Sequence, residues 1–348
     1  MKYLLLSPLC LLFFCLSTSG QHKITMDDLS RKTVHFDKPA ASDVPTVFRH
    51  FEVIDERPDT GRIGISLMIG TLRGNYDRQF VFEKPAAAEI SEYLNRYFTR
   101  PDAPFTALVV LRSLWLSNSN DLEGVKNAEI QYEQWHIRLK AEVYATRDSQ
   151  YIPVFRYDTA WAKKIHSYVT AMHSSFSDLE TSLSTLFIYL ADSASWVTER
   201  KQNPGRMISR QQISEFNRSR FDKFADTNTT YASGVYANFE EFTNNAPSIR
   251  DFEIRMEKKD HLLYIKDAAG KTSYSDDAWG YSNGDSLFIM RDGILRPVWK
   301  EGKAFYFYAL SDKDVYTKPN EYRYGGNASP GEKEQCIYTL DTDSGEIY

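Results

Sequence analysis

Eleven consecutive residues, 135–145, alternate strictly between apolar side chains and polar or amphipathic ones. The odd-numbered positions, from Trp135 to Ala145, are all apolar, and the even-numbered positions are His136, Arg138, Lys140, Glu142 and Tyr144. Successive side chains of a β-strand point to opposite faces, so this pattern predicts a half-buried antiparallel strand. We expect the odd-numbered face to lie in a core.

The residues around this strand predict a sheet backed by a helix. An apolar run at 105–116 has the length of a strand covered on both faces. Pro85 suits the first turn of a helix, and Pro153 restricts its own strand to a sheet edge, because it cannot donate to a ladder. Further strands are expected at 47–54, 63–69, 79–82 and 151–155. Residues 45–157 are therefore predicted to form an α+β domain.

The rest of the chain changes character twice. Apolar residues recur at helical spacing between Trp161 and Phe224, which predicts a helical connector over 158–226. Ser209 and Gln212 have the spacing of a capping box inside it. Over 234–348, closely spaced turns separate alternating segments, which predicts an antiparallel β-meander domain. The fold class expected for the whole chain is α+β.

A joint between these two parts is expected at 234–249. Gly234 permits a change of chain direction, and Asn238 with Glu241 has the spacing of a capped short helix. Asn245 favours a left-handed exit, and Pro247 pushes the preceding residue into an extended conformation. These features predict a strand end, one helical turn and an extended exit.

The amino-acid sequence of this joint resembles that of a group of uncharacterised exported bacterial envelope proteins. The resemblance covers the last third of the chain best and rests on the pattern Gly234-x-Tyr236-x-x-Phe239-x-Glu241-Phe242-x-x-Asn245-x-Pro247-Ser248-Ile249, with Trp279-Gly280-Tyr281 downstream. It implies a bacterial envelope context and carries over no catalytic residue.

The first residues have the pattern of an export signal. Lys2 supplies a positive start, residues 3–16 are almost wholly apolar, and 17–20 offer small residues for cleavage before Gln21. We expect a signal peptide at 1–20 and a polar leader at 21–44. No later run approaches 18 apolar residues, so no transmembrane span is expected in the mature chain.

The cysteines predict a cleaved product that is not a lipoprotein. Leu9 and Phe14 stand where a small residue should precede a lipidated Cys10 or Cys15. Removal of the signal leaves Cys336 alone, which excludes an intramolecular disulfide. The expected location is the periplasm or the extracellular space.

Charge and motifs exclude several classes of function. The formal net charge of −5 comes from interspersed signs, which argues against a nucleic-acid partner. The chain has none of the nucleophile-elbow, P-loop or zincin motifs, and we expect no cofactor. His166 and His173 lack companions for a metal site. Residues 341–346 are interpreted as a hairpin turn, because a calcium loop would place glycine at position six and glutamate at position twelve.

Two groups of residues are candidates for a site. Asp55, Arg57 and Asp59 cluster in a predicted loop, where functional residues are often found, although acidic turns are also common. A candidate ligand platform comprises Tyr274, Trp279 and Tyr281, whose rings are of the kind that stacks on a sugar or on a partner side chain. The competing interpretation is that these rings form the core of a small β domain.

The leading hypothesis is an exported, non-enzymatic binding or scaffold module whose partner is an envelope protein or a glycan. The alternative is a cell-envelope or glycan hydrolase with two carboxylates from distant segments. A cleft with two acids about 5–10 Å apart would favour the hydrolase. An exposed pair of rings at Trp279 and Tyr281 would favour the binding module.

Overall fold

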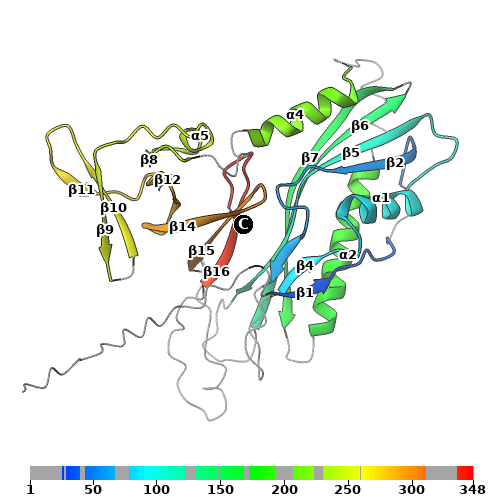
Figure 1. Cartoon of the computed structure of the whole chain (residues 1–348). Helices are drawn as coiled ribbons and strands as arrows, with labels where there is room; N and C mark the ends of the chain where they lie inside the picture. The colour runs from blue at the N-terminus through cyan, green and yellow to red at the C-terminus, as the bar shows by residue number, and fades with distance from the viewer. Residues whose placement is uncertain are drawn as a thin grey trace, which may run out of the picture.

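The computed structural model describes residues 26, 29–39, 44–66, 78–121, 131–147, 149–167, 172–192, 207–222, 230–258, 260–310 and 335–347. Within these ranges the chain is α+β, with an N-terminal mixed sheet and a C-terminal antiparallel sheet side by side (Figure 1). The C-terminus lies between the two sheets. The predicted signal peptide, 1–20, lies outside the described residues.

The first sheet is organised around two long central strands. Strand β5 has parallel neighbours β2 and β3 on one side and the antiparallel neighbour β6 on the other. The order along the sheet is β1-β4-β3-β5-β6-β7, with β2 beside β5. The strands are β1 (Ser30–Thr33), β2 (Phe48–Asp55), β3 (Gly64–Ser66), β4 (Arg78–Val81), β5 (Phe105–Asp121), β6 (Gln131–Arg147) and β7 (Gln150–Ser167).

The alternating strand of the sequence is the middle of β6, and its apolar face is buried as predicted. All six odd-numbered side chains from Trp135 to Ala145 are at most 1% exposed. Helices α1 (Ala86–Tyr97) and α2 (Met172–Ala191) cover this face of the sheet. Ile90 of α1 and Leu183 of α2 belong to the same core cluster as Val143.

The opposite face of β6 differs from the prediction, because it is also covered. Lys140 is only 2% exposed, and Tyr144 is buried. Helix α4 (Arg210–Asp222) contributes Ile213 to a cluster with Leu108 and Tyr144 on this face. The sequence predicted a half-buried strand because the segments that cover its polar face come from much later in the chain.

One predicted boundary, the start of the helical connector at residue 158, differs in the structure. Strand β7 continues to Ser167, and Trp161 pairs with Ile137 where a helix was expected from residue 158. Short apolar runs do not by themselves distinguish a strand from a helix, and aromatic and β-branched residues favour the strand. The stripe from Leu179 to Leu190 does form α2, and Ser209 and Gln212 form the predicted capping box.

The predicted polar leader, 21–44, also differs from a free linker. It contains β1, which pairs in parallel with β4, and Val34 is buried in the main core. Met26 and Leu29 pack in a cluster with Trp115 of β5. The few apolar residues in this segment make its packing contacts with the first sheet, although the average composition of the segment is polar.

The second sheet is antiparallel, and the predicted joint leads into it. Asn238 caps α5 by accepting a hydrogen bond of 3.0 Å from the Glu241 backbone, and Asn245 has the expected left-handed φ of 50°. The elements are β8 (Gly234–Tyr236), α5 (Phe239–Thr243), β9 (Phe252–Glu257), β10 (Asp260–Lys266), β11 (Thr272–Tyr274), β12 (Gly280–Ser282), β13 (Leu287–Arg291), β14 (Ile294–Glu301), β15 (Ala304–Leu310) and β16 (Gln335–Leu340). Across the ranges that the structure describes, no helix is long and apolar enough to cross a membrane.

Candidate functional site at the interface of the two sheets

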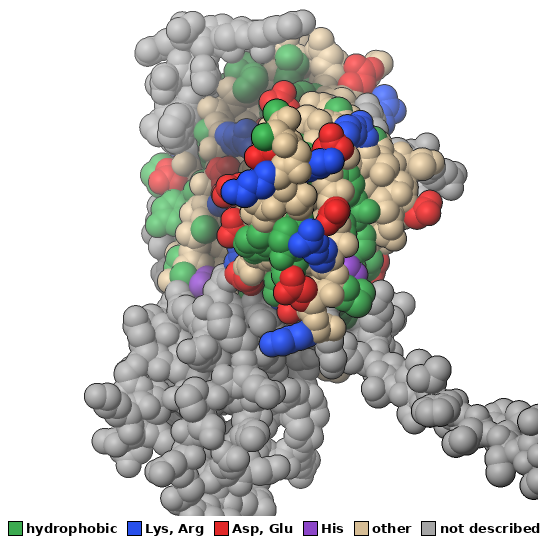
Figure 2. All heavy atoms as spheres, turned by 90° about the vertical axis from the view of Figure 1, so that its left-hand side faces the viewer, with side chains coloured by type: hydrophobic (Ala, Val, Ile, Leu, Met, Phe, Trp, Pro, Cys, Tyr) green, Lys and Arg blue, Asp and Glu red, His purple; other side chains and the backbone are tan. Residues whose placement is uncertain are grey.

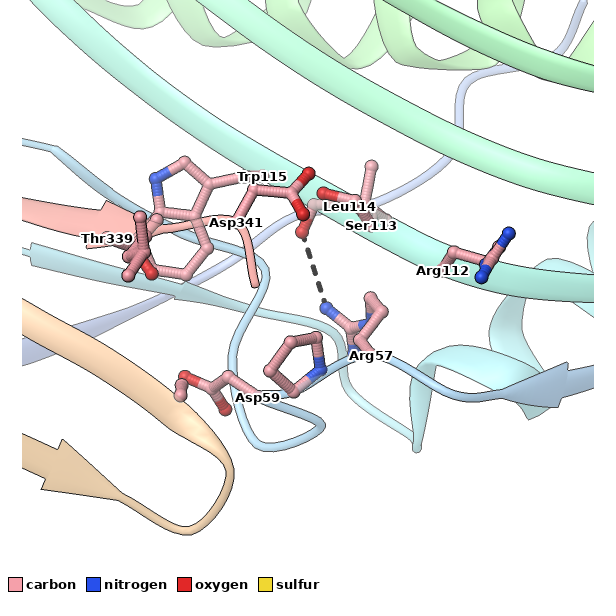
Figure 3. Close-up of a pocket in the computed structure, with 11 residues that line it drawn as sticks. Arg57, Asp59, Arg112, Ser113, Leu114, Trp115, Thr339 and Asp341 are labelled. Carbon is pink, nitrogen blue, oxygen red and sulfur yellow. Dashed lines mark hydrogen bonds between the residues drawn. The ribbon is translucent and has the colours of Figure 1, made fainter. Parts of the chain in front are cut away.

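The first part of the site is the loop of residues 55–62, between β2 and β3, which Arg57 organises. Its guanidinium forms two hydrogen bonds of 2.8 Å with the carboxylate of Asp55. It also donates to the backbone carbonyls of Arg62 at 2.8 Å and Leu114 at 3.4 Å (Figure 3). Because Arg57 is buried and its donors are engaged, it fixes the shape of this loop.

Asp59 connects the loop to the second sheet. One of its carboxylate oxygens accepts the backbone N–H groups of Gly61 and Arg62. The other accepts a hydrogen bond of 2.5 Å from the hydroxyl of Tyr306 in β15. Arg62 lies 3.3 Å from the same carboxylate and forms a second ion pair, at 2.9 Å, with Glu301. The three predicted loop residues thus lie at the interface, where Arg57 and Asp55 hold the loop and Asp59 contacts the second sheet.

The second part of the site is the turn formed by residues 341–346, which we call the C-terminal turn. It is a hairpin turn as predicted, since the Asp341 N–H donates to the Glu346 carbonyl and Leu340 bridges to Ile347. Its carboxylates face the polar side of the first sheet and helix α4. Asp341 binds Lys140, and Glu346 lies 2.6 Å from Arg138 and 3.3 Å from Lys140.

Asp343, in the middle of the turn, binds two arginines. It accepts a hydrogen bond of 2.7 Å from Nε of Arg220 in α4, and the second carboxylate oxygen contacts the same guanidinium. Arg112 of β5 approaches Asp343 to 3.7 Å and forms a 2.5 Å ion pair with Glu142 of β6. We call the four cations that meet the turn the basic strip: Arg112, Arg138, Lys140 and Arg220.

A β-bulge in β5 determines the position of Arg112 within the basic strip. The pairing of β5 with β6 shifts register between Leu111 and Ser113, so Arg112 stands at the irregularity. Bulges insert an extra residue into one strand and redirect side chains. Leu111 before the bulge and Leu114 after it both belong to the main core, which leaves Arg112 on the face toward the turn.

The electrostatics of the interface follow from burial and charge. Burial lowers the pKa of Arg112, the nearby Arg220 lowers it further, and Glu142 and Asp343 oppose the shift. Burial alone would raise the pKa of Glu346, but the hydrogen bonds and charges of Lys140 and Arg138 outweigh it and hold the pKa below its ordinary value. Burial, and then the charge of Asp59, raise the pKa of Tyr306 well above its ordinary range.

A small cavity lies between the loop and the C-terminal turn (Figure 3). Its volume is about 30 Å³, and its lining includes Arg57, Arg112, Trp115, Thr339 and Asp341. A cavity of this size has room for water but not for a sugar ring.

The predicted ligand platform is not brought together as a single surface. The ring of Trp279 stacks on Phe242 of α5 with centroids 4.1 Å apart, and it is partly buried against the core cluster of the second sheet. Tyr281 stacks on Phe288 in a different cluster. Tyr274 is 44% exposed, and its hydroxyl donates to the Gly293 carbonyl. Trp279 and Tyr281 therefore pack on other side chains of the second sheet, as the competing interpretation expects.

No metal cluster is present among the residues that the structure describes. His166 lies in β7 and His173 in α2, so they do not share a helix face. The basic strip is not predicted by the sequence. Its signal lies in the charged even-numbered positions of β6, which the alternation assigns to the face opposite the core.

The comparisons with known proteins assign no family to this chain. No protein-family model matches the chain, and no curated protein matches it. One solved structure with similarity is that of the protein XCC0632 from Xanthomonas campestris, described as DUF330. It is 12% identical, with a TM-score of 0.31, and the match covers 51% of this chain and all of that one.

Proposed function

We propose that the protein is an exported, non-enzymatic binding or scaffold module that presents its two sheets as one body. The observation that supports this most is the interface itself. Lys140, Arg57 and Arg112 are buried there, and each is bound to a carboxylate of the chain. Buried charges paired in this way fix geometry, and they are not available as free acids or bases for a reaction.

The export part of the proposal rests on the sequence. A positively charged start, an apolar run at 3–16 and small residues before Gln21 are the pattern of a cleaved signal peptide. The resemblance of the joint at 234–249 to exported envelope proteins supports the same location, with an envelope protein or a glycan as partner.

A hydrolase is the competing function, and the interface offers it little. Glycoside hydrolysis needs two carboxyl groups about 5–10 Å apart at a sugar-sized opening, one of them with a raised pKa. The acids at this interface are bound to cations, the pKa of Glu346 is lowered, and the cavity is small.

The far end of the second sheet is the surface that we assign to a partner. Figure 2 shows this face, where apolar side chains gather between charged ones. Met256 of β9 is 68% exposed, and Tyr274 of β11 is 44% exposed. In the strand pairing Tyr274 lies opposite Tyr264 and Met256 lies opposite His261, so the two side chains project from opposite faces of this end of the sheet. The proposed partner contacts one of these two faces, where exposed apolar side chains are available.

The test is crosslinking in intact source cells, followed by purification and mass spectrometry of what accompanies the mature protein. We expect one abundant partner that is lost with the double variant Met256→Ser/Tyr274→Ala and kept with the control Lys271→Ala, an exposed residue of the same end. Trp279→Ala is a poor probe because it removes core packing. Hydrolysis of envelope polysaccharides by the purified protein would overturn the proposal.

A further inference from the structure

We propose that the basic strip is a binding site for an acidic peptide segment, and that the C-terminal turn occupies this site as an internal ligand. The inference rests on the proposed binding function and names the chemistry of one partner: an extended or turn segment with aspartate and glutamate two to three residues apart.

The charge balance of the first sheet carries the first step. Three of the four cations stand on the first sheet, and the sheet places a carboxylate on two of them, Glu142 on Arg112 and Asp158 on Arg138. The third, Lys140, binds Asp341 and Glu346 of the turn. A buried ammonium requires anionic groups, and for Lys140 the turn supplies them.

The geometry of the contacts carries the second step. The three acidic residues of the turn each meet a different part of the strip: Asp341 meets Lys140, Asp343 meets Arg220 through both oxygens, and Glu346 meets Arg138. Two-point contact between guanidinium and carboxylate is the geometry by which arginine recognises an acidic side chain.

The strip also has donor capacity that the turn does not use. Within the described residues, Nε of Arg112 is buried and has no hydrogen-bond partner. Buried unpaired donors are rare in folded proteins, and they mark places where a further acceptor fits. An acidic segment with one more oxygen at this point would satisfy the strip better than the turn does.

The composition of the turn carries the last step. Residues 341–346 read Asp-Thr-Asp-Ser-Gly-Glu and contain no hydrophobic side chain, so the contact with the strip is entirely polar. The apolar residues on either side, Leu340 and Ile347, pack within the second sheet. Glu346 remains 52% exposed at its side chain. Exchange of this turn for another acidic segment therefore costs no apolar burial on the strip, and it is steered by charge.

The experiment uses the full chain with the charges of the turn removed, Asp341→Asn/Asp343→Asn/Glu346→Gln. The probe is a fluorescent synthetic peptide of residues 339–348, measured by anisotropy at low salt. We expect the triple variant to bind it at least tenfold more tightly than the wild-type protein, and to lose affinity as salt rises. Lys140→Met in the triple-variant background should abolish binding, and a peptide with Asn and Gln in place of its acids should not bind.

A second variant covers the case in which the triple variant does not fold. Glu346→Gln alone removes a half-exposed carboxylate and should give a smaller gain, about threefold, in peptide affinity. The inference is overturned if a folded variant, checked by near-ultraviolet circular dichroism, binds no peptide at millimolar concentration or binds the neutral peptide equally well. A cellular partner that depends on Met256 and Tyr274, found together with a negative peptide result, would remove this inference and leave the proposed function standing.

Discussion

The hydroxyl of Tyr306 donates a 2.5 Å hydrogen bond to the carboxylate of Asp59, and the two residues are 247 positions apart in the sequence. Tyr306 is fully buried, and its ring packs 6.2 Å from that of Trp115 in the first sheet. One side chain of β15 thus makes both a polar and an apolar contact with the first sheet. Because Tyr306 shares one buried cluster with Met26, Leu29, Ile65 and Trp115, we expect the two sheets to unfold together.

Tyr306→Phe should lower the free energy of unfolding by about 1–3 kcal/mol, because Asp59 loses a partner inside the interface. The measurement is urea denaturation followed by circular dichroism. Tyr264→Phe is the matched control, since that hydroxyl donates to Glu257 at an exposed site, and its effect should stay within about 0.5 kcal/mol. Equal losses for the two variants would contradict the role assigned to Tyr306.

The Tyr306–Asp59 pair also predicts that the stability of the fold depends on pH in the alkaline range. Burial and then Asp59 raise the pKa of Tyr306 above that of an unfolded tyrosine, so the folded state prefers the neutral phenol. Its contribution is fully present below the unfolded pKa of about 10 and is lost as pH rises above that value toward the folded pKa. The stability difference between the wild-type protein and Tyr306→Phe should therefore be constant below about pH 10 and shrink above it. A difference that grew above that pH would contradict the assignment.

Lys140→Met should destabilise the protein by about 3–5 kcal/mol, since it leaves the carboxylate of Asp341 buried without its cation. Asp341→Asn in the same background should restore a large part of the loss, because the uncompensated charge is gone. A double-mutant cycle measured by chemical denaturation gives the coupling. Additive effects of the two changes would show that the residues do not act as a pair.

The lowered pKa of Glu346 predicts that the stability of the fold decreases at acidic pH. Its pKa is below the ordinary value in the folded state, so its contribution is present above the unfolded pKa of about 4.5 and is lost as pH falls through the folded pKa. Because the side chain is half exposed, we expect at most about 1 kcal/mol. Unfolding curves of Glu346→Gln and the wild-type protein should converge as the pH falls below about 4.5, and an unchanged gap down to pH 2 would refute the assignment.

Val143→Asp should unfold the first sheet, because it places an unpaired charge on the core face of β6, in the cluster to which α1 and α2 also contribute. Val143→Ala, which only removes volume at the same position, should keep the fold and lose about 1–3 kcal/mol. Thermal melts followed by far-ultraviolet circular dichroism distinguish the two. A melting curve for Val143→Asp that matches that of the wild-type protein would refute the position of this strand in the core.

The sequence predicted the local structure better than the site. The strand at 135–145 and the capped turn at Asn238 depend on residues near one another in the chain, and both are confirmed. The true length of β7 was missed because its apolar spacing also fits a helix. The basic strip was missed because the carboxylates that bury Lys140 lie 201 and 206 residues downstream. Local pattern shows that a face is charged, but not which distant segment covers it.

Both ends of the described chain meet at the interface: Met26 and Leu29 pack with Tyr306, and residues 341–346 bind the basic strip. A ribosome makes the first sheet long before it makes Asp341. During that interval Lys140 lacks Asp341 and Glu346, the carboxylates that bind it in the finished protein. The nascent first sheet therefore carries this lysine without those two partners throughout synthesis of the second sheet, and a chain that stops before residue 341 never acquires them.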